Sequence, residues 1–324
     1  MSDSLWKEVA DARKRLEGVA HVTPTFTCSS LDQIAKSSVW LKAESLQRTG
    51  SFKFRGAYNA LSAMPEDERE KGVITHSSGN HGQALALAAK MLDKRAFVIM
   101  PENSPAVKQE AVAAYGAMVI TCEPTQSARE EKTHELIERT SAVFIDSHDD
   151  LHVIAGQATA AVELIEQSGP FDILLAPVGG GGLIAGTAIA ASHLLDNARV
   201  IGCEPAAADD AYRSLATGER ITNFTPQTIA DGLRTPLGEL NFEIMQQLVD
   251  SIVLVSEEEI VRAMRFVWER MKLIIEPSSA VAVAPLLSGA IGGNGERIGV
   301  ILSGGNVDLD RFFAPIEKTS AGKD

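Results

Sequence analysis

Nine short apolar runs, rich in β-branched residues, are spread along this chain, with helical stretches between them. The runs are SVWLKAE, GVITH, AFVIM, AMVIT, AVFID, DILLAPV, RVIGCEP, SIVLVS and RIGVILSGG. Helices are expected at HGQALALAAKML, SPAVKQEAVAAY, QSAREEKTHELIERT and SEEEIVRAMRFVWERM, and the last begins with Ser256 and Glu259 spaced as a capping box. Runs that are apolar on both faces and alternate with helices predict parallel sheets joined by right-handed crossovers.

Nine strands are compatible with one large sheet or with two smaller sheets around a cleft. Residues 72–149 hold four regular strand–helix units, and we expect them to form a small mobile domain. Residues 1–71 and 150–324 then form a larger domain, which gives an α/β fold of two parallel-sheet domains with the active site in the cleft between them. Fewer than about 20 residues follow the last predicted strand, which leaves no room for an appended regulatory domain.

The chain is acidic and contains few cysteines. It has 324 residues, of which 45% are hydrophobic, and a net charge of −13. This charge argues against nucleic acid and anionic membranes as partners. The three cysteines are far apart and have no metal-binding spacing, which is typical of reduced thiols. The amphipathic N-terminus lacks the apolar core of a signal peptide and no apolar run is long enough to span a bilayer, so we expect a cytoplasmic protein.

The strongest local signal is the segment DILLAPVGGGGLIAG, in which a buried strand leads through four glycines, 179–182, into a helix. Four glycines favour neither strand nor helix, so the loop must require bare backbone. A glycine loop that opens a helix presents N–H groups and the positive dipole end to an anion, typically phosphate. The loop matches neither a P-loop nor GxGxxG. A tight strand–helix turn is the alternative, although one or two glycines would serve that purpose.

Two further polar turns follow predicted strands. THSSGNHGQALA places Ser77, Ser78, Asn80 and His81 in one turn before a helix, a set suited to binding a carboxylate. Ordinary N-capping explains one of these residues but not all of them. RIGVILSGGNVD ends an apolar strand at Ser303, where a plain turn is an equally good reading. Because ligands bind at the carboxyl ends of parallel strands, all three turns are expected to face one crevice.

Lys53 lies between two phenylalanines in RTGSFKFRGA. An amine held against aromatic surface loses hydration and more easily becomes neutral and nucleophilic. A phosphate cradle, a carboxylate-binding turn and such a lysine together suggest pyridoxal 5′-phosphate, with Lys53 as the residue that forms the Schiff base. A lone lysine with a buried stem would otherwise be read as structural.

The motifs SFKFRGA, SSGNHG, GGGGLIAG and SGGNVD resemble the markers of the fold-type II, tryptophan-synthase-β-like pyridoxal enzymes. Within that group they resemble the branch of serine racemases and serine/threonine dehydratases, which includes the 3-hydroxyaspartate ammonia-lyases. The likeness covers nearly the whole chain, because EPAAADDAY, TIADGL and WERMKLIIEP are also similar to that branch. In the related cysteine-synthase branch a threonine typically stands where His81 stands here, which argues against β-replacement with sulfide.

The resemblance implies a role for each cofactor-binding residue. Lys53 binds the cofactor and then moves the α-proton on one face, while Phe52 packs beside the ring. Asn80 hydrogen-bonds the phenolic oxygen and Ser303 meets the pyridine nitrogen. The phosphate is held by Gly179, Gly180, Gly181, Gly182 and Leu183. A hydroxyl at the pyridine nitrogen does not keep the ring protonated, so neighbouring acids and bases steer the reaction.

The resemblance also implies substrate contacts. Ser77, Ser78 and His81 grip the substrate carboxylate, and Ser78 is placed where the racemases hold a second base opposite Lys53. Two bases on opposite faces permit racemisation, whereas a single productive base favours elimination of a β-hydroxyl. Both outcomes stay open. Ser78 as an N-cap only is the alternative.

Positions around the substrate's far end and a metal site are implied as well. Arg129 and Thr235 match positions near the far end of the substrate, and Arg129 as a helix-surface residue is an equal alternative. Glu204, the carbonyl of Ala208, and Asp210 match a divalent-ion site, and carboxylates with a backbone oxygen suit Mg²⁺, Ca²⁺ or Mn²⁺. A solvated acidic loop is the alternative reading.

A nucleotide effector is a further option, since some racemases of the branch hold a nucleotide at a subunit interface. The matching residues, for which solvated helix positions are an equal explanation, are Gln83, Lys108 and Tyr115. A homodimer is usual in the family. His148 and His152, at the predicted domain crossing, are assigned no chemistry.

The sequence thus predicts a pyridoxal-phosphate-dependent ammonia-lyase that acts on L-serine, L-threonine or 3-hydroxyaspartate, with racemisation of serine as a second or even the main activity. Two other functions are weighed against it. A non-catalytic phosphate-ligand sensor would not need Lys53, and a β-replacement synthase would need an added thiol.

Overall fold

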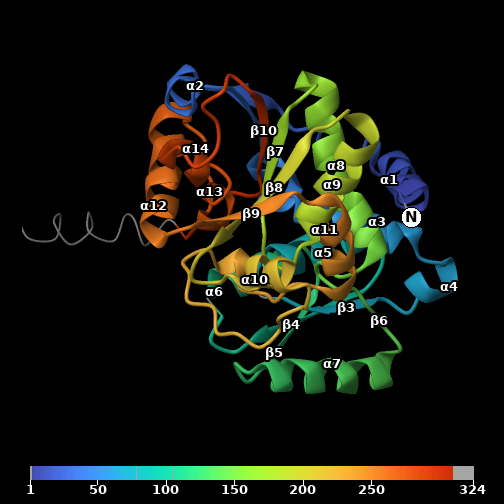
Figure 1. Ribbon diagram of the computed structural model, residues 1–324. Coiled ribbons are helices and arrows are strands. Elements are labelled where there is room, and N and C mark those ends of the chain that lie inside the picture. Colours follow the sequence, from blue (N-terminus) through green and yellow to red (C-terminus); the bar gives the residue numbers. More distant parts are fainter. Residues whose placement is uncertain (1, 78, 105, 309–324) are drawn as a thin grey trace, which may run out of the picture.

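Figure 1 shows the computed structural model, which describes residues 2–77, 79–104 and 106–308. These residues form two β-sheets, one of six strands and one of four, with helices on both faces of each. The strands of each sheet come from segments far apart in the sequence. The expected α/β fold with two parallel-sheet units is confirmed.

The larger sheet has the strand order β1-β2-β10-β7-β8-β9. Its strands are β1 (Thr25–Thr27), β2 (Ser38–Ala43), β7 (Ile173–Pro177), β8 (Arg199–Pro205), β9 (Ser251–Val255) and β10 (Arg297–Leu302). All neighbouring pairs are parallel except β1 with β2, which is antiparallel. β10 is therefore a central strand, and its carboxyl end opens into the segment that contains Ser303.

The smaller sheet has the order β5-β4-β3-β6, and all its pairs are parallel. Its strands are β3 (Val73–His76), β4 (Ala96–Pro101), β5 (Met118–Cys122) and β6 (Val143–Phe144). They follow one another in the chain between residues 73 and 144, as the strand–helix spacing predicts. The domain boundaries at 71/72 and 149/150 stay a prediction.

The helices alternate with these strands. They are α1 (Ser2–Leu16), α2 (Ser29–Ala35), α3 (Lys53–Ala63), α4 (Glu66–Arg69), α5 (Asn80–Met91), α6 (Ala106–Ala114), α7 (Gln126–Thr140), α8 (Leu151–Ser168), α9 (Gly182–Leu194), α10 (Asp210–Thr217), α11 (Glu239–Leu248), α12 (Glu257–Phe266), α13 (Pro277–Ala280) and α14 (Ala284–Ser288). The short helical turns are η1 (Glu44–Leu46), η2 (Arg48–Gly50), η3 (Asp231–Leu233) and the π-turn η4 (Val267–Met271).

Two hydrophobic cores cover the faces of the larger sheet. Helices α1, α8, α9 and α11 pack on one face, and α2, α12, α13 and α14 pack on the other. The smaller sheet is covered by α7 on one face and by α5 and α6 on the other. Helix α3 packs against both α8 and α5, so it joins the two units. This position matters because α3 begins at Lys53.

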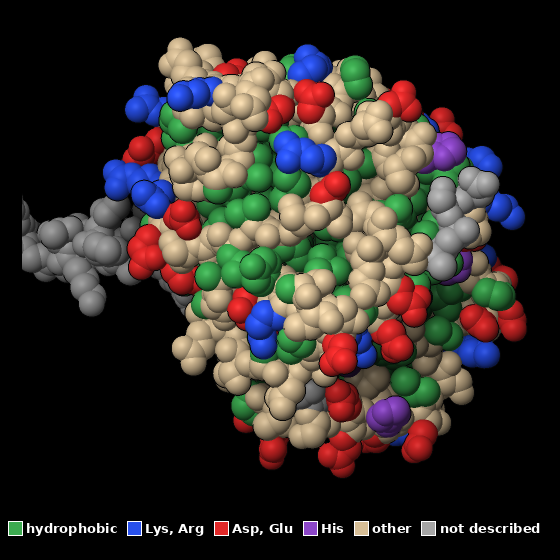
Figure 2. All heavy atoms as spheres, in the orientation of Figure 1, with side chains coloured by type: hydrophobic (Ala, Val, Ile, Leu, Met, Phe, Trp, Pro, Cys, Tyr) green, Lys and Arg blue, Asp and Glu red, His purple; other side chains and the backbone are tan. Residues whose placement is uncertain are grey.

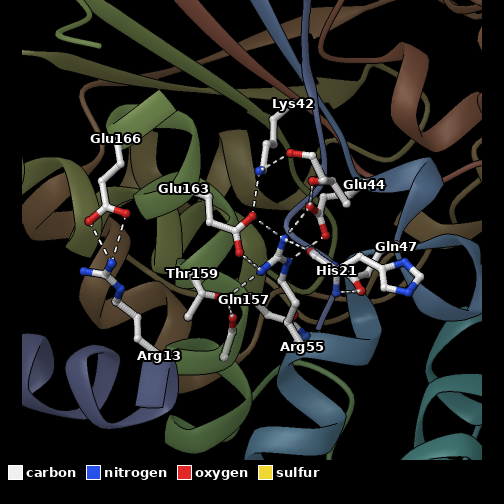
Figure 3. Close-up of polar contacts among 12 residues, drawn as sticks. Arg13, His21, Lys42, Glu44, Gln47, Arg55, Gln157, Thr159, Glu163 and Glu166 are labelled. Atoms are coloured by element: carbon white, nitrogen blue, oxygen red, sulfur yellow. Dashed lines mark hydrogen bonds and ion pairs between the residues drawn. The ribbon is translucent and has the colours of Figure 1, made fainter. Parts of the chain in front are cut away.

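A buried ion cluster fixes α3 to the larger sheet (Figure 3). The guanidinium of Arg55 forms ion pairs with Glu44 at 2.7 Å and with Glu163 at 2.7 Å. Glu163 also pairs with Lys42 at 2.6 Å, while Thr23 donates to Glu44 at 2.6 Å. Two positive and two negative side chains therefore balance in the interior, as buried charges require.

The expected elements form, with two differences. All nine predicted strands are present, and the capping box of Ser256 and Glu259 starts α12. The helix predicted to continue to Met271 instead ends as the π-turn η4, with Lys272 left-handed at its end. Trp268 donates from this turn to the carbonyl of Ile275 at 3.0 Å, a contact that no local pattern indicates. Strand β1 was not predicted, because three residues carry no periodicity.

Acidic and basic side chains are interspersed over the face shown in Figure 2, and apolar side chains gather across its middle. A surface hollow of about 390 Å³ lies between α10, α11 and β9, lined by residues such as Tyr212 and Met245. Among the described residues, no helix is long and apolar enough to cross a membrane.

Candidate active site

Lys53 lies beside the carboxyl end of β10. The backbone N–H of Phe52 donates to the carbonyl of Ser303 at 3.0 Å, which ties the start of α3 to the end of this strand. The Nζ of Lys53 donates to the carbonyl of Ser147 at 2.6 Å and lies 5.2 Å from the centroid of the Phe52 ring. The amine is thus placed between the larger sheet and the loop that follows β6.

The surroundings of Lys53 favour a neutral amine. Burial lowers the pKa of Lys53 to about 8, although the charges of Asp146 and Glu276 act to raise it. At neutral to mildly alkaline pH a substantial share of this side chain is therefore deprotonated. A neutral amine is the nucleophilic form of lysine.

The four glycines 179–182 connect β7 to α9 and are closely approached by other parts of the chain. Gly181 has a φ of +93°, in the left-handed region that favours glycine. An ideal Cβ on Gly180 would lie 2.2 Å from Cδ2 of His148, so no larger residue fits there without displacing that ring.

The same loop offers free backbone donors. No described residue accepts a hydrogen bond from the backbone N–H of Gly179, Gly180 or Gly181. The first turn of α9 adds N–H groups that have no acceptor within the helix. Together with the positive end of the helix dipole, these donors suit a phosphate group.

The polar turn after β3 meets the end of β10. The Nδ2 of Asn80 donates to both carboxylate oxygens of Glu276, at 2.9 and 3.2 Å, and the Nδ2 of Asn306 donates to Oδ1 of Asn80 at 2.9 Å. The hydroxyl of Ser77 accepts a hydrogen bond within its own turn at 3.3 Å. Ser78 lies outside the described residues. Three of the sequence motifs are thereby brought together, since Asn80, Ser303 and Lys53 surround one site.

His81 is buried near Lys53. The residue is only 2% exposed, and the groups that act on its ring are Lys53, Asp146, His148 and the backbone of Ile145. Burial and the charge of Lys53 lower the pKa of His81 to about 3, against the opposing charge of Asp146. The imidazole is therefore neutral at physiological pH.

Sequence reasoning assigned no role to the 146–150 loop, which the structure places next to Lys53 and the glycines. The carboxylate of Asp146 accepts hydrogen bonds from the backbone N–H groups of His148 and Asp149, at 2.8 and 2.9 Å. Asp149 in turn accepts the N–H of Glu239 at 2.9 Å and so caps α11. The available signal was the polar run DSHDD directly after a predicted strand.

Glu276 was also missed. It is 4% exposed and lies between Asn80 and the backbone of Gly304, whose ideal Cβ would be 2.7 Å from its Oε1. In the sequence it is a glutamate just before Pro277, which reads as an ordinary helix start. Only the fold reveals that this carboxylate faces Lys53.

Two expected substrate contacts are not brought to Lys53 by any contact between described residues. Arg129 lies on α7, and its Nε donates at 3.4 Å to the carbonyl of Thr125, the N-cap of that helix. Thr235 lies in an exposed segment after η3. Of the expected nucleotide contacts, Gln83 lies on α5 and Tyr115 just after α6, and the side chain of Lys108 lies outside the described part of the chain.

Glu204, near the end of β8, directs its carboxylate to the first turn of α10, which begins at Asp210. The Glu204 carboxylate accepts the N–H groups of Ala211 and Tyr212, at 3.0 and 2.8 Å, and Asp210 accepts that of Leu237 at 2.8 Å. The pKa of Glu204 is raised to about 8 and that of Asp210 to about 6, chiefly by burial. The described residues contain no cluster of three or more His, Cys, Asp or Glu side chains that would hold a metal.

Comparison with known proteins decides the family. Residues 16–304 match the family model described as "Pyridoxal-phosphate dependent enzyme". The chain belongs to this family. It is 48% identical over 307 residues to a serine racemase of Dictyostelium discoideum, covering 94% of this chain and 95% of that protein. It is 44% identical over 313 residues to an L-threo-3-hydroxyaspartate ammonia-lyase of a Pseudomonas species, covering 96% of this chain and 98% of that protein.

A solved structure agrees with the family. The maize serine racemase superimposes with a TM-score of 0.94 at 38% identity, covering 97% of each chain. This pyridoxal-phosphate-dependent enzyme also fits its cofactor chemically. It has a lysine of lowered pKa and a glycine loop whose N–H groups lack acceptors, as an aldehyde and a phosphate require.

Proposed function

We propose that the enzyme removes water and then ammonia from a β-hydroxy amino acid, with L-serine, L-threonine and 3-hydroxyaspartate as candidate substrates, and that it also racemises serine. The observation that carries this proposal is the amine of Lys53, whose pKa of about 8 allows it to take and return a proton near neutral pH. The relatives named serine racemase and ammonia-lyase support both reactions. A primarily racemising enzyme, with elimination as a side reaction, is the second candidate.

The cofactor-holding residues follow from the site. Lys53 would bind the aldehyde, Phe52 would pack beside the ring, and Asn80 would reach the phenolic oxygen. The phosphate would be held by Gly179, Gly180, Gly181, Gly182 and Leu183. When bound, pyridoxal phosphate supplies an electron sink for the bond that breaks at the α-carbon. Ser303, 3% exposed at the end of β10, would meet the pyridine nitrogen with a neutral hydroxyl.

Proton transfer is assigned to two sides of the site. Lys53 holds or releases the α-proton on one face, and the charges of Asp146 and Glu276 stabilise its protonated form. Ser78, outside the described residues, is proposed as the base on the other face. A substrate deprotonated by Lys53 and reprotonated from Ser78 changes its configuration, whereas loss of the β-hydroxyl before reprotonation gives elimination.

The substrate would be oriented by its carboxylate. Ser77, Ser78 and the neutral imidazole of His81 are proposed to bind it through hydrogen bonds rather than through a full charge. Arg129 and Thr235 remain proposed contacts for the far end of the substrate, on the strength of the sequence resemblance alone.

A divalent ion, Mg²⁺ or alternatively Ca²⁺ or Mn²⁺, is proposed at Glu204, the carbonyl of Ala208, and Asp210. The donor set fits, because the buried Oδ1 of Asp210 has no hydrogen-bond partner and both carboxyls have raised pKa values. A cation would stabilise both as carboxylates. The ion would then support the large domain near α10.

A cytoplasmic homodimer is the proposed assembly and location. A nucleotide effector bound by Gln83, Lys108 and Tyr115 is proposed as an option for this dimer. Sedimentation tests the homodimer, and a change in sedimentation on addition of ATP tests the nucleotide effector.

The function is tested with purified enzyme and a panel of L- and D-serine, L-threonine and the 3-hydroxyaspartate isomers, with keto acid and product enantiomer both measured. Lys53→Ala is expected to abolish every activity and the visible absorbance of the bound cofactor, while Lys90→Ala, an exposed lysine on α5, is expected to change neither. Keto acid formation from serine without any thiol excludes a synthase.

Ser78→Ala separates the two reactions. It is expected to abolish racemisation while elimination of L-serine persists, because only one base remains. Equal loss of both reactions would contradict the assignment of two bases, and full activity of Lys53→Ala would contradict the whole proposal.

A further inference from the structure

The glycine loop that would hold the phosphate contains no charged residue. Its donors are backbone N–H groups, and the protein as a whole carries a net charge of −13, which repels an anion. A side-chain donor that can become cationic would add a stronger, charge-assisted hydrogen bond to the phosphate. Such a donor would have to come from the neighbours of the four glycines.

One ionisable side chain lies among the nearest contacts of these glycines. The ring of His148 is nearest to Gly180, where an ideal Cβ would lie 2.2 Å from Cδ2 and 2.7 Å from Nε2. The backbone of His148 also lies against Gly182, whose ideal Cβ would be 2.9 Å from the His148 carbonyl oxygen. The corresponding contacts of Gly179 and Gly181 are with leucine, glycine and asparagine.

The orientation of the imidazole is fixed from its other side. Its Nδ1 is 2.9 Å from the hydroxyl of Ser147 and 3.2 Å from Oδ1 of Asp146. Asn241, on α11, donates its Nδ2 to the carbonyls of both His148 and Gly180, at 2.9 and 2.8 Å, and so clamps the loop and the glycines together. Nε2 makes no hydrogen bond to any described residue. A histidine held at one nitrogen presents the other to a ligand.

We propose that the Nε2 of His148 is a ligand of the cofactor's phosphate group, supplementing the backbone N–H groups of the tetraglycine loop. This inference rests on the proposed placement of the phosphate at that loop. It also gives a role to the 146–150 loop, since Ser147 and Asp146 then act as positioning residues that hold the ring through Nδ1.

The charges around His148 agree with this role. Burial lowers the pKa of His148, Asp146 and Asp149 act to raise it, and Lys53 and His76 act to lower it further. The net effect lowers the pKa and favours the neutral ring, and an anion bound at Nε2 would act in the opposite direction by favouring the protonated form. The carboxylate at Nδ1 and the phosphate at Nε2 would then share one imidazolium, which strengthens both hydrogen bonds.

The test compares two probes, pyridoxal phosphate and pyridoxal, which lacks the phosphate, in equilibrium dialysis against the apoenzyme. His148→Gln is expected to weaken binding of pyridoxal phosphate by about tenfold or more, the usual effect of losing a charge-assisted hydrogen bond. Binding of pyridoxal is expected to stay unchanged. The matched control is His152→Gln, a half-buried histidine four residues further on that pairs with Glu8, and it should affect neither probe.

The outcomes distinguish this inference from the proposed function. A wild-type enzyme with no preference for pyridoxal phosphate over pyridoxal would show that the phosphate is not held as proposed. A preference that persists in His148→Gln would overturn only the role of His148. Equal weakening of both probes would also overturn it, because the residue would then act on the ring or on the fold.

A second measurement needs no variant. In the wild-type apoenzyme, carbethoxylation of each histidine by diethyl pyrocarbonate can be located by mass spectrometry. Pyridoxal phosphate and inorganic phosphate are expected to protect His148, whereas pyridoxal is not, and His152 should be modified in every case. Unchanged modification of His148 in the presence of pyridoxal phosphate would refute the proposal.

Discussion

Removing the charge of Glu44 should destabilise the enzyme strongly, although Glu44 does not touch the proposed cofactor site. Its carboxylate is fully buried and accepts hydrogen bonds from Arg55 at 2.7 and 2.8 Å and from Thr23 at 2.6 Å (Figure 3). In Glu44→Gln one negative charge disappears while the buried cations Arg55 and Lys42 remain, with only Glu163 to balance them. Breaking a buried ion pair from one side costs about 3–5 kcal/mol. Glutamine keeps one acceptor, so we expect the lower end, about 3 kcal/mol.

The matched control is Glu166→Gln in the same region. Glu166 pairs with Arg13 at 2.8 Å, but the two side chains are 48% and 42% exposed. An exposed pair contributes about 0–1 kcal/mol. The assay is urea unfolding of both apoenzymes at neutral pH. If the free energy of unfolding falls by about 3 kcal/mol per M of urea, the loss expected for Glu44→Gln lowers the unfolding midpoint by about 1 M.

The pH dependence provides an independent check on the same pair. Burial alone would raise the pKa of Glu44, but the charge and hydrogen bonds of Arg55 outweigh it and hold the pKa below the ordinary value of 4.5. The folded enzyme then binds this proton less readily than the unfolded chain, so the stabilisation is complete above pH 4.5 and is lost as the pH falls below it. The difference in the free energy of unfolding between the wild type and Glu44→Gln should therefore become smaller in acid. Equal midpoint shifts for Glu44→Gln and Glu166→Gln at neutral pH would refute this reasoning.

Three further outcomes are expected. The rate at which the apoenzyme gains the absorbance of bound pyridoxal phosphate should rise with pH and level off above about pH 8, where Lys53 is neutral; a flat profile between pH 6 and 9 would contradict the lowered pKa. Gly180→Val should lower the affinity for pyridoxal phosphate in dialysis by at least about tenfold, because its side chain would displace the ring of His148, and an unchanged affinity would exclude the close approach. Mg²⁺ should raise the melting temperature of the wild type but not of Glu204→Gln.

The sequence was informative where function depends on local backbone chemistry. Runs apolar on both faces predicted nine strands, and the glycines 179–182 predicted a loop of bare backbone. Gly180 and Gly181 show why, since the first leaves no room for a Cβ and the second is left-handed. Such requirements act on the residue itself, and they can therefore be read from the residue type.

Contacts between distant segments could not be predicted in this way. Glu276 lies 196 residues from Asn80 in the chain, yet the two are hydrogen-bonded, and nothing near Glu276 distinguishes it from a glutamate at a helix start. His148 packs its ring against Gly180 and accepts a hydrogen bond at its backbone carbonyl from Asn241 on α11, and neither residue is near it in sequence. The charges that act on the pKa of Lys53 come from these distant segments. The flanking phenylalanines therefore indicated only that this pKa is lowered, and not by how much.

Helix α3 explains how one short segment serves both the site and the stability of the fold. Lys53 and Arg55 are two residues apart, and an α-helix turns by about 100° per residue, so their side chains point in nearly opposite directions. Lys53 reaches the carbonyl of Ser147, while Arg55 reaches Glu44 and Glu163 in the interior. The guanidinium of Arg55 is neutralised by these carboxylates and anchors the helix. The amine of Lys53 is therefore free to change its protonation. A change in the ion cluster should therefore alter stability more than it alters the pKa of Lys53, and a change at Asp146 or Glu276 should do the reverse.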